Sequence, residues 1–203
     1  MVKSGYNDSF ISTKRIETLV DGIFAIAMTL MVLNLHLPDT TGGTNAAVWA
    51  ALGNQGTNIF IYALSFFILT AFWLNHHRGF DQIQRADMGL FRLNVIWLFF
   101  VAIMPFSTYL VGDYGSSTPA ALFFNTNLFL LGIFSFLIRR QVIENELSDK
   151  PLKKEDVNLT YKLHLIIPGI AALGMILSFL IPDYCYFVYL LQPILPTIIK
   201  RIS

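Results

Sequence analysis

The chain has 203 residues, of which 55% are hydrophobic and 13% are charged, and its net charge at pH 7 is +1. Soluble domains carry about 25% charged residues, so this composition excludes a soluble protein and indicates an integral protein of the lipid bilayer, with no nucleic acid among its partners. The single cysteine, Cys185, excludes an internal disulfide and a cysteine-rich metal site.

Six apolar runs follow one another along the chain, each close to the roughly 20 helical residues needed to cross a bilayer. They cover residues 16–37, 57–75, 91–111, 119–138, 159–181 and 184–200. A milder apolar stretch over 46–56 precedes the second run, as either a helix extension or a turn. Because little of the chain lies outside these runs, we expect one all-α transmembrane domain over residues 1–203.

The first run carries acidic side chains near its start. Glu17 and Asp21 lie four residues apart and therefore on one face of a helix. Possible partners at the same membrane depth follow the second run and open the third, namely His76, His77, Arg78, Arg92 and Asn94. Two interpretations stay open: a polar clamp that ties helix ends together, or a site that binds protons or gates the protein.

Another face of the first run is almost entirely apolar. Thr29, Leu30 and Leu33 each fall within about 60° of Ile26 on a helix, whereas Asp21 points roughly 140° away from Ile26. From spacing alone, such a stripe faces lipid, packs against another helix or lines a pore.

The later runs hold no catalytic or metal-binding pattern. His76 and His77 are adjacent and point about 100° apart on a helix, so a shared metal ion is not expected. No serine or cysteine nucleophile has an evident base, so we expect no enzyme and no catalytic residues. Residues 111–115 (VGDYG) resemble a scrambled potassium-filter sequence but are interpreted as an outer turn, and residues 139–158 as a cytoplasmic linker that continues the fourth helix.

The basic residues divide the gaps between the runs into two kinds. All 14 Lys and Arg residues lie at the chain ends or in every second gap, whereas the gaps around Asp39, Asp113 and Asp183 hold acids and no bases. Because short cytoplasmic loops retain positive charge, the pattern predicts an even number of membrane crossings with both termini in the cytoplasm. We expect this multi-pass protein in the plasma membrane.

The start of the first run resembles a known family. Residues 15–22 (RIETLVDG), followed by IFAIAMTL and ending at Leu37 and Pro38, resemble the first-helix signature of the potassium channels called transmembrane protein 175, in their prokaryotic six-helix branch. In the family string R-x-x-x-F-S-D, Arg15 and Asp21 match, whereas Leu19 and Val20 replace Phe and Ser. Residues 72–78 (FWLNHHR) and 105–108 (PFST) match as well.

The resemblance implies a homotetramer in which the first helices surround a pore that has no carbonyl filter. Potassium is the implied permeant ion, and no cofactor is implied. By distance from Asp21, rings of Ile26, Leu30 and Leu33 with a layer of Thr29 would form the constriction. A structural hydrogen-bond network beneath it would comprise Arg15, Asp21, Trp73, His77 and Asn94.

Apolar rings supply no oxygen ligands, so the expected selectivity for potassium over sodium is modest. Two other classes remain open. A proton-coupled transporter of small solutes would use Glu17 and Asp21 as its relay. A passive membrane scaffold would show no flux at all.

Overall fold

The computed structural model describes residues 11–36, 43–83, 85–148 and 154–202, and nearly all of them are helical. Leu37 and Asp39, which the sequence analysis places at the outer end of the first helix, lie outside these residues. The elements are α1 (Thr13–Leu30), η1 (Met31–Asn34), α2 (Asn45–Asn54), α3 (Gly56–Phe80), α4 (Met88–Tyr114), α5 (Thr118–Glu144), α6 (Lys154–His164), α7 (Ile166–Leu180), η2 (Pro182–Leu191) and α8 (Leu195–Ile202).

Five helical stretches of the described residues are long and apolar enough to cross a membrane. They are Thr13–Asn34, Gly56–Phe80, Met88–Tyr114, Thr118–Glu144 and Asp156–Leu180. These match the first five predicted runs and extend most of them by several residues. The apolar prelude over 46–56 is a separate helix, α2, which ends just before α3.

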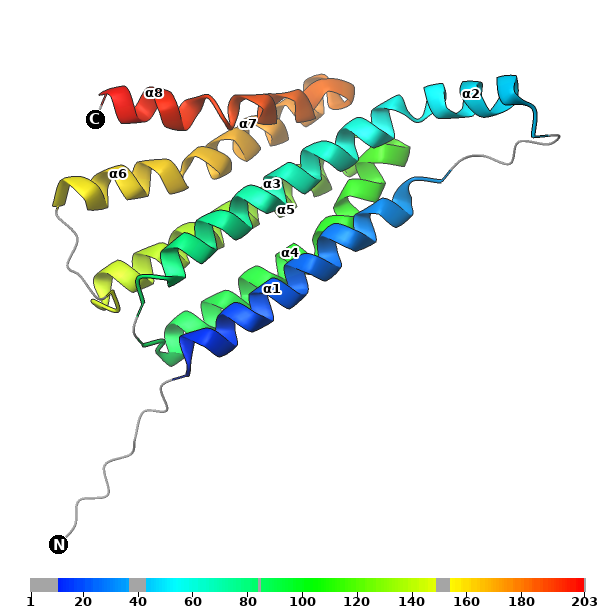
Figure 1. Ribbon diagram of the computed structural model, residues 1–203. Helices are drawn as coiled ribbons and strands as arrows, with labels where there is room; N and C mark the ends of the chain where they lie inside the picture. Colours follow the sequence, from blue (N-terminus) through cyan, green and yellow to red (C-terminus); the bar gives the residue numbers. More distant parts are fainter. Residues whose placement is uncertain (1–10, 37–42, 84, 149–153, 203) are drawn as a thin grey trace, which may run out of the picture.

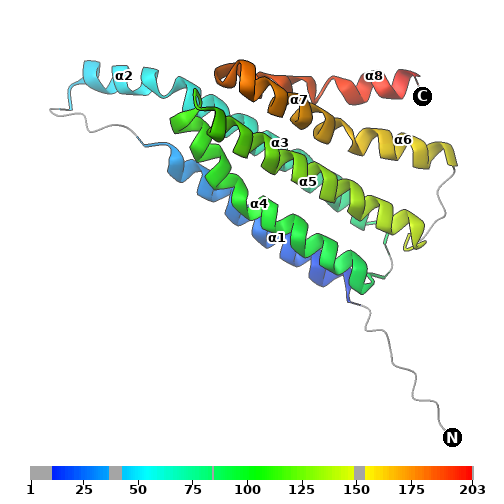
Figure 2. The same ribbon diagram turned by 180° about the vertical axis from the view of Figure 1, so that it is seen from behind.

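The long helices alternate in direction (Figures 1 and 2). α4 packs against α1, α3 and α5, whereas α7 packs against α5 and η2. α1, α4 and the α6–α7 pair run one way, and α3, α5 and the η2–α8 segment run back, so α1 begins and α8 ends at the same end of the bundle (Figure 1). The bases that flank these helix ends, including Arg15, Arg78, Arg139 and Lys162, therefore belong to that end, whereas Asp113 and Asp183 belong to the other.

Proline interrupts the fifth and sixth runs. Pro168 has no N–H to donate to the carbonyl of His164, which explains the break between α6 and α7 at Leu165. The single helix predicted over 184–200 is wrong, because Pro193 separates η2 from α8. The chain turns there through hydrogen bonds from Gln192 N to Tyr189 O and from Ile194 N to Leu191 O.

Polar side chains, some of them buried, fix how the helices meet. Asp87 caps α4 by accepting from Leu90 N at 2.6 Å, and it also accepts from Gln141 and Asn145 near the end of α5. Asn125 of α5 accepts a 2.7 Å hydrogen bond from the Tyr189 hydroxyl of η2 and donates to Ser178 of α7. The broken sixth segment is therefore still attached to the bundle.

Candidate functional site

α1 presents two faces of different character. Its inner face is buried against the bundle at a spacing of three or four residues, through Ile16, Val20, Phe24, Ala27 and Met31. Because this face packs against the bundle, the opposite face of α1 is left exposed. On it Ile26 is 59% exposed, Leu30 is 45% exposed and Leu33 is 68% exposed. The residues of the predicted constriction thus lie on the uncovered face of α1.

Small and hydroxyl side chains accompany this apolar face. Gly22 and Ala25 are exposed, and a Cβ added at Gly22 would meet no atom within 4 Å. Thr29 is exposed too, but its hydroxyl hydrogen-bonds back to the Ala25 carbonyl at 2.8 Å and lies 2.9 Å from the Ile26 carbonyl. The face is therefore apolar in effect, with room for the close approach of another helix.

The N-terminal half of α1 is tied to α3 by a short polar chain. Trp73 Nε1 donates a 2.8 Å hydrogen bond to Asp21 Oδ1. The His77 ring stacks on the Trp73 ring, with centroids 5.6 Å apart and planes 6° from parallel. His77 Nε2 lies 3.9 Å from Asp81 Oδ2. Three residues of the predicted network, Asp21, Trp73 and His77, thus lie in contact.

The remaining two residues of that predicted network are placed differently. Asn94 Oδ1 lies at hydrogen-bond distance, 2.7 Å, from His76 Nε2. The buried His76 ring stacks between the rings of Phe80 and Trp97, with centroid distances of 4.1 and 4.9 Å. Asn94 therefore belongs to the buried α3–α4 contact and not to the Asp21 chain. Arg15 is exposed, and its side chain has no hydrogen bond or ion pair with the part of the chain that the structure describes.

Glu17 joins the same end of α1. One ligand-bearing atom from each of Glu17, His77 and Asp81 lies within 4.8 Å of the other two. His76, which the sequence places beside His77, points elsewhere. His77 and Asp81 are exposed, and exposed acidic groups often gather without an ion, so the expectation of no metal site stays a prediction.

One anchor of α1 was not anticipated. Asn34 of η1 donates a 2.9 Å hydrogen bond to the Pro105 carbonyl of α4, which fixes the far end of the first span. The signal was present as a lone amide inside an apolar run, because a polar side chain at that depth needs a partner. Its partner is a backbone group, which no sequence motif marks.

Comparison with known proteins gives the arrangement a family context. A family model described as endosomal/lysosomal potassium channel TMEM175 matches residues 15–105. A Streptomyces collinus protein named potassium channel is 37% identical over 100 residues, 49% of this chain and 48% of that protein. A Chamaesiphon minutus protein of the same name is 27% identical over 172 residues, 83% of this chain and 85% of that one.

Other matches differ in length and in name. A Bos taurus protein named endosomal/lysosomal proton channel TMEM175 is 33% identical over 101 residues, which cover 47% of this chain and only 21% of that protein. The chain thus aligns with about half of the Streptomyces protein and a fifth of the bovine one.

The fold extends the likeness beyond the matched first half. The crystal structure of a lysosomal potassium-selective channel TMEM175 homolog from Chamaesiphon minutus superposes with a TM-score of 0.78 and 25% identity. The superposition covers 92% of this chain and 96% of that one. Residues 15–105 therefore match the TMEM175 family, and the chain as a whole shares the fold of a prokaryotic homolog of that family.

Proposed function

We propose that this protein is a potassium channel of the plasma membrane, a homotetramer in which four copies of α1 surround the pore. The names of its bacterial relatives support a potassium channel, and the match to a channel family agrees with the expectation that the chain is no enzyme. The tetramer, the pore lining and the cellular membrane are our proposals.

One observation carries the proposal, namely the uncovered face of α1 that bears Ile26, Leu30 and Leu33. A helix that exposes an apolar face on one side encloses a pore only when copies of it are arranged about an axis. Gly22 and Ala25 beside the stripe allow those copies to approach closely. Lipid-facing residues need no such small neighbours.

Ion passage follows from the chemistry of the stripe. A narrow ring of Ile26 side chains offers no oxygen ligands, because the isoleucine side chain is a hydrocarbon. The neighbouring Thr29 hydroxyl donates its proton to the backbone. An ion crosses by shedding part of its hydration shell or when the ring becomes wetted. Potassium holds water less tightly than sodium, so selectivity is modest, and a dewetted ring closes the pore.

The polar chain at the inner end of α1 has a structural role in this proposal. The Asp21 carboxylate accepts from Trp73, so it has a fixed partner on α3 and points away from the stripe. Asp21 and Trp73 hold α1 at the angle that aims Ile26 toward the axis. Arg15 stays in the proposed network as the exposed base beneath it.

A second candidate ion is the proton. The bovine relative is named a proton channel, and Glu17, His77 and Asp81 gather at the inner end of α1. Carboxylates and a histidine at such short distances can transfer a proton from one to another. A proton-coupled transporter that uses Glu17 and Asp21 as its relay shares Glu17 with this cluster.

A flux assay on the purified protein in liposomes separates these candidates. We expect unitary currents and potassium efflux faster than sodium efflux, with a fourfold particle in detergent. Saturable uptake driven by a pH gradient without unitary currents favours the transporter, and proton flux without potassium flux favours the proton channel. A stable monomer or dimer in lipid removes the pore proposal.

A further inference from the structure

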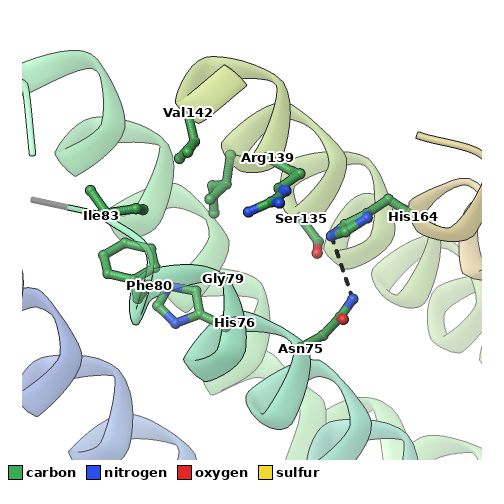
Figure 3. Close-up of a pocket in the computed structure, with 10 residues that line it drawn as sticks. Asn75, His76, Gly79, Phe80, Ile83, Ser135, Arg139, Val142 and His164 are labelled. Carbon is green, nitrogen blue, oxygen red and sulfur yellow. Dashed lines mark hydrogen bonds between the residues drawn. The ribbon is translucent and has the colours of Figure 1, made fainter. Parts of the chain in front are cut away.

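A pocket lined by bases lies between α3, α5 and α6, on the side of α3 that faces away from α1. Its outer part has a volume of about 180 Å³ and adjoins an inner cavity of about 20 Å³. Both parts share the residues Asn75, Gly79, Arg139 and His164. Figure 3 shows the Arg139 side chain extending from α5 into the inner part, beside His164.

The Arg139 guanidinium has no counter-charge within the described residues. Its Nε is buried without a hydrogen-bond partner, and no ion pair reaches the side chain. Nη1 lies over Gly79, 3.7 Å from the position that a Cβ there would occupy. Burying a charge without a partner is costly. The cavity therefore presents a fork of N–H donors that lacks its acceptor.

The rest of the lining adds donors and no acids. Arg78 is exposed at the rim of the outer part and has no ion pair with any described residue. Asn75 Nδ2 makes only a long 3.4 Å contact to His164 Nε2, so its amide can turn toward a ligand. No Asp or Glu stands among the described residues that line either part.

We propose that this pocket binds a phosphate group, held by Arg139 from the inner side and by Arg78 and Asn75 from the rim. Arginine suits this ligand because its planar fork matches phosphate oxygens in pairs. The pocket lies where α3 and α5 end, and basic pockets between helices at such a level bind lipid headgroups. A phospholipid headgroup and a free phosphate ion share this chemistry.

Thermal unfolding of the purified full-length protein in a neutral detergent tests the site. The probes are inorganic phosphate and dioctanoyl phosphatidylglycerol, with sodium chloride and dioctanoyl phosphatidylcholine as controls at matched concentration. Ligand that binds the folded state raises the unfolding midpoint. A saturable rise with phosphatidylglycerol alone identifies a lipid headgroup, and a rise with both probes identifies the phosphate ion.

The neighbouring arginine supplies the matched control. Arg140 is exposed on the same helix and is already paired with Glu144 at 2.7 Å, so Arg140→Gln should respond like the wild type. Arg139→Gln should bind about tenfold more weakly or worse, the effect of losing a hydrogen bond to a charged group.

Two results overturn the proposal. One is a wild-type midpoint that moves no further with either probe than with its control, and the other is an equal response of the Arg139→Gln and Arg140→Gln variants. If Arg139→Gln does not fold, Arg78→Gln at the exposed rim decides instead. Binding that is several-fold weaker supports the site, and unchanged binding overturns it.

Discussion

Replacement of Ile26 by asparagine tests the constriction most directly. In a tetramer Ile26→Asn places four amide groups at the narrowest ring, where each amide oxygen can replace water around a sodium ion. The amides also favour wetting of the ring. We expect a larger resting current and a potassium to sodium permeability ratio closer to unity.

The substitution should cost one chain little stability. Ile26 is 59% exposed, so only about two fifths of the roughly 1.5–3 kcal/mol for full burial is lost, or about 0.6–1.2 kcal/mol. That loss is small beside the roughly 5–15 kcal/mol by which proteins are stable. A change in selectivity would therefore report on the pore and not on unfolding.

Ile176 provides the matched control, because it is the same residue type, 61% exposed, on α7. Reversal potentials in mixed potassium and sodium solutions are the measurement for both variants. Ile176→Asn should leave the permeability ratio unchanged. If Ile26→Asn conducts with the wild-type ratio, or if both variants shift it equally, Ile26 does not select ions and Thr29 becomes the next position to test.

Three further variants test the fold and the base of α1. Asp21→Asn should lower tetramer yield on size exclusion and the unfolding midpoint while leaving the ion ratio of surviving channels nearly unchanged, because Asp21 binds Trp73 and not the ion path; a well-assembled variant with altered selectivity contradicts this. Gly132→Ala should destabilise the protein by about 1–3 kcal/mol, since the added Cβ would lie 2.6 Å from Pro168 Cδ. Gly169→Ala, whose Cβ meets nothing within 4 Å, should be neutral or stabilising, and equal thermal shifts for the two glycines would refute the close contact. Tyr189→Phe should cost about 1–3 kcal/mol by denaturant titration, because it leaves buried Asn125 Oδ1 unpaired; exposed Tyr184→Phe is its control, and a loss of equal size there would count against the buried bond.

Hydropathy located the first five crossings because apolar length is a property of composition, which the sequence displays directly. It stopped short at the helix ends. α5 continues through residues 139–144, as the interpretation of 139–158 as a continuation of the fourth helix predicted, because the helical backbone satisfies its own hydrogen bonds beyond the apolar core. The break at Pro193 was not predicted, because a count of apolar residues does not register a missing backbone N–H.

The polar residues near α1 were found, but the partner of Asn94 was not. His76 and His77 both lie opposite Asn94 in membrane depth, and they point about 100° apart on α3. Which of them meets Asn94 depends on the rotation of α3 against α4. The stacking of His76 between Phe80 and Trp97 sets that rotation, and none of these contacts is local in sequence. The basic pocket was missed for the same reason, because Arg78, Arg139 and His164 meet only in the fold.

The last turns of α3 connect the two sites on which the proposals rest. Trp73 and His77 lie on the face toward α1, whereas Asn75 and Gly79, two residues further along in each case, lie about 200° around the helix and face α5 and α6. A helix rotates as a rigid element, so these contacts cannot change independently. An anion held between Arg78 and Arg139 would fix the rotation of α3. It would thereby also fix the position of the Trp73 indole, which donates its hydrogen bond to Asp21. An anion in this pocket, held from α5 and α6 on the far side of α3, would therefore help to position the proposed pore helix through the Trp73–Asp21 hydrogen bond.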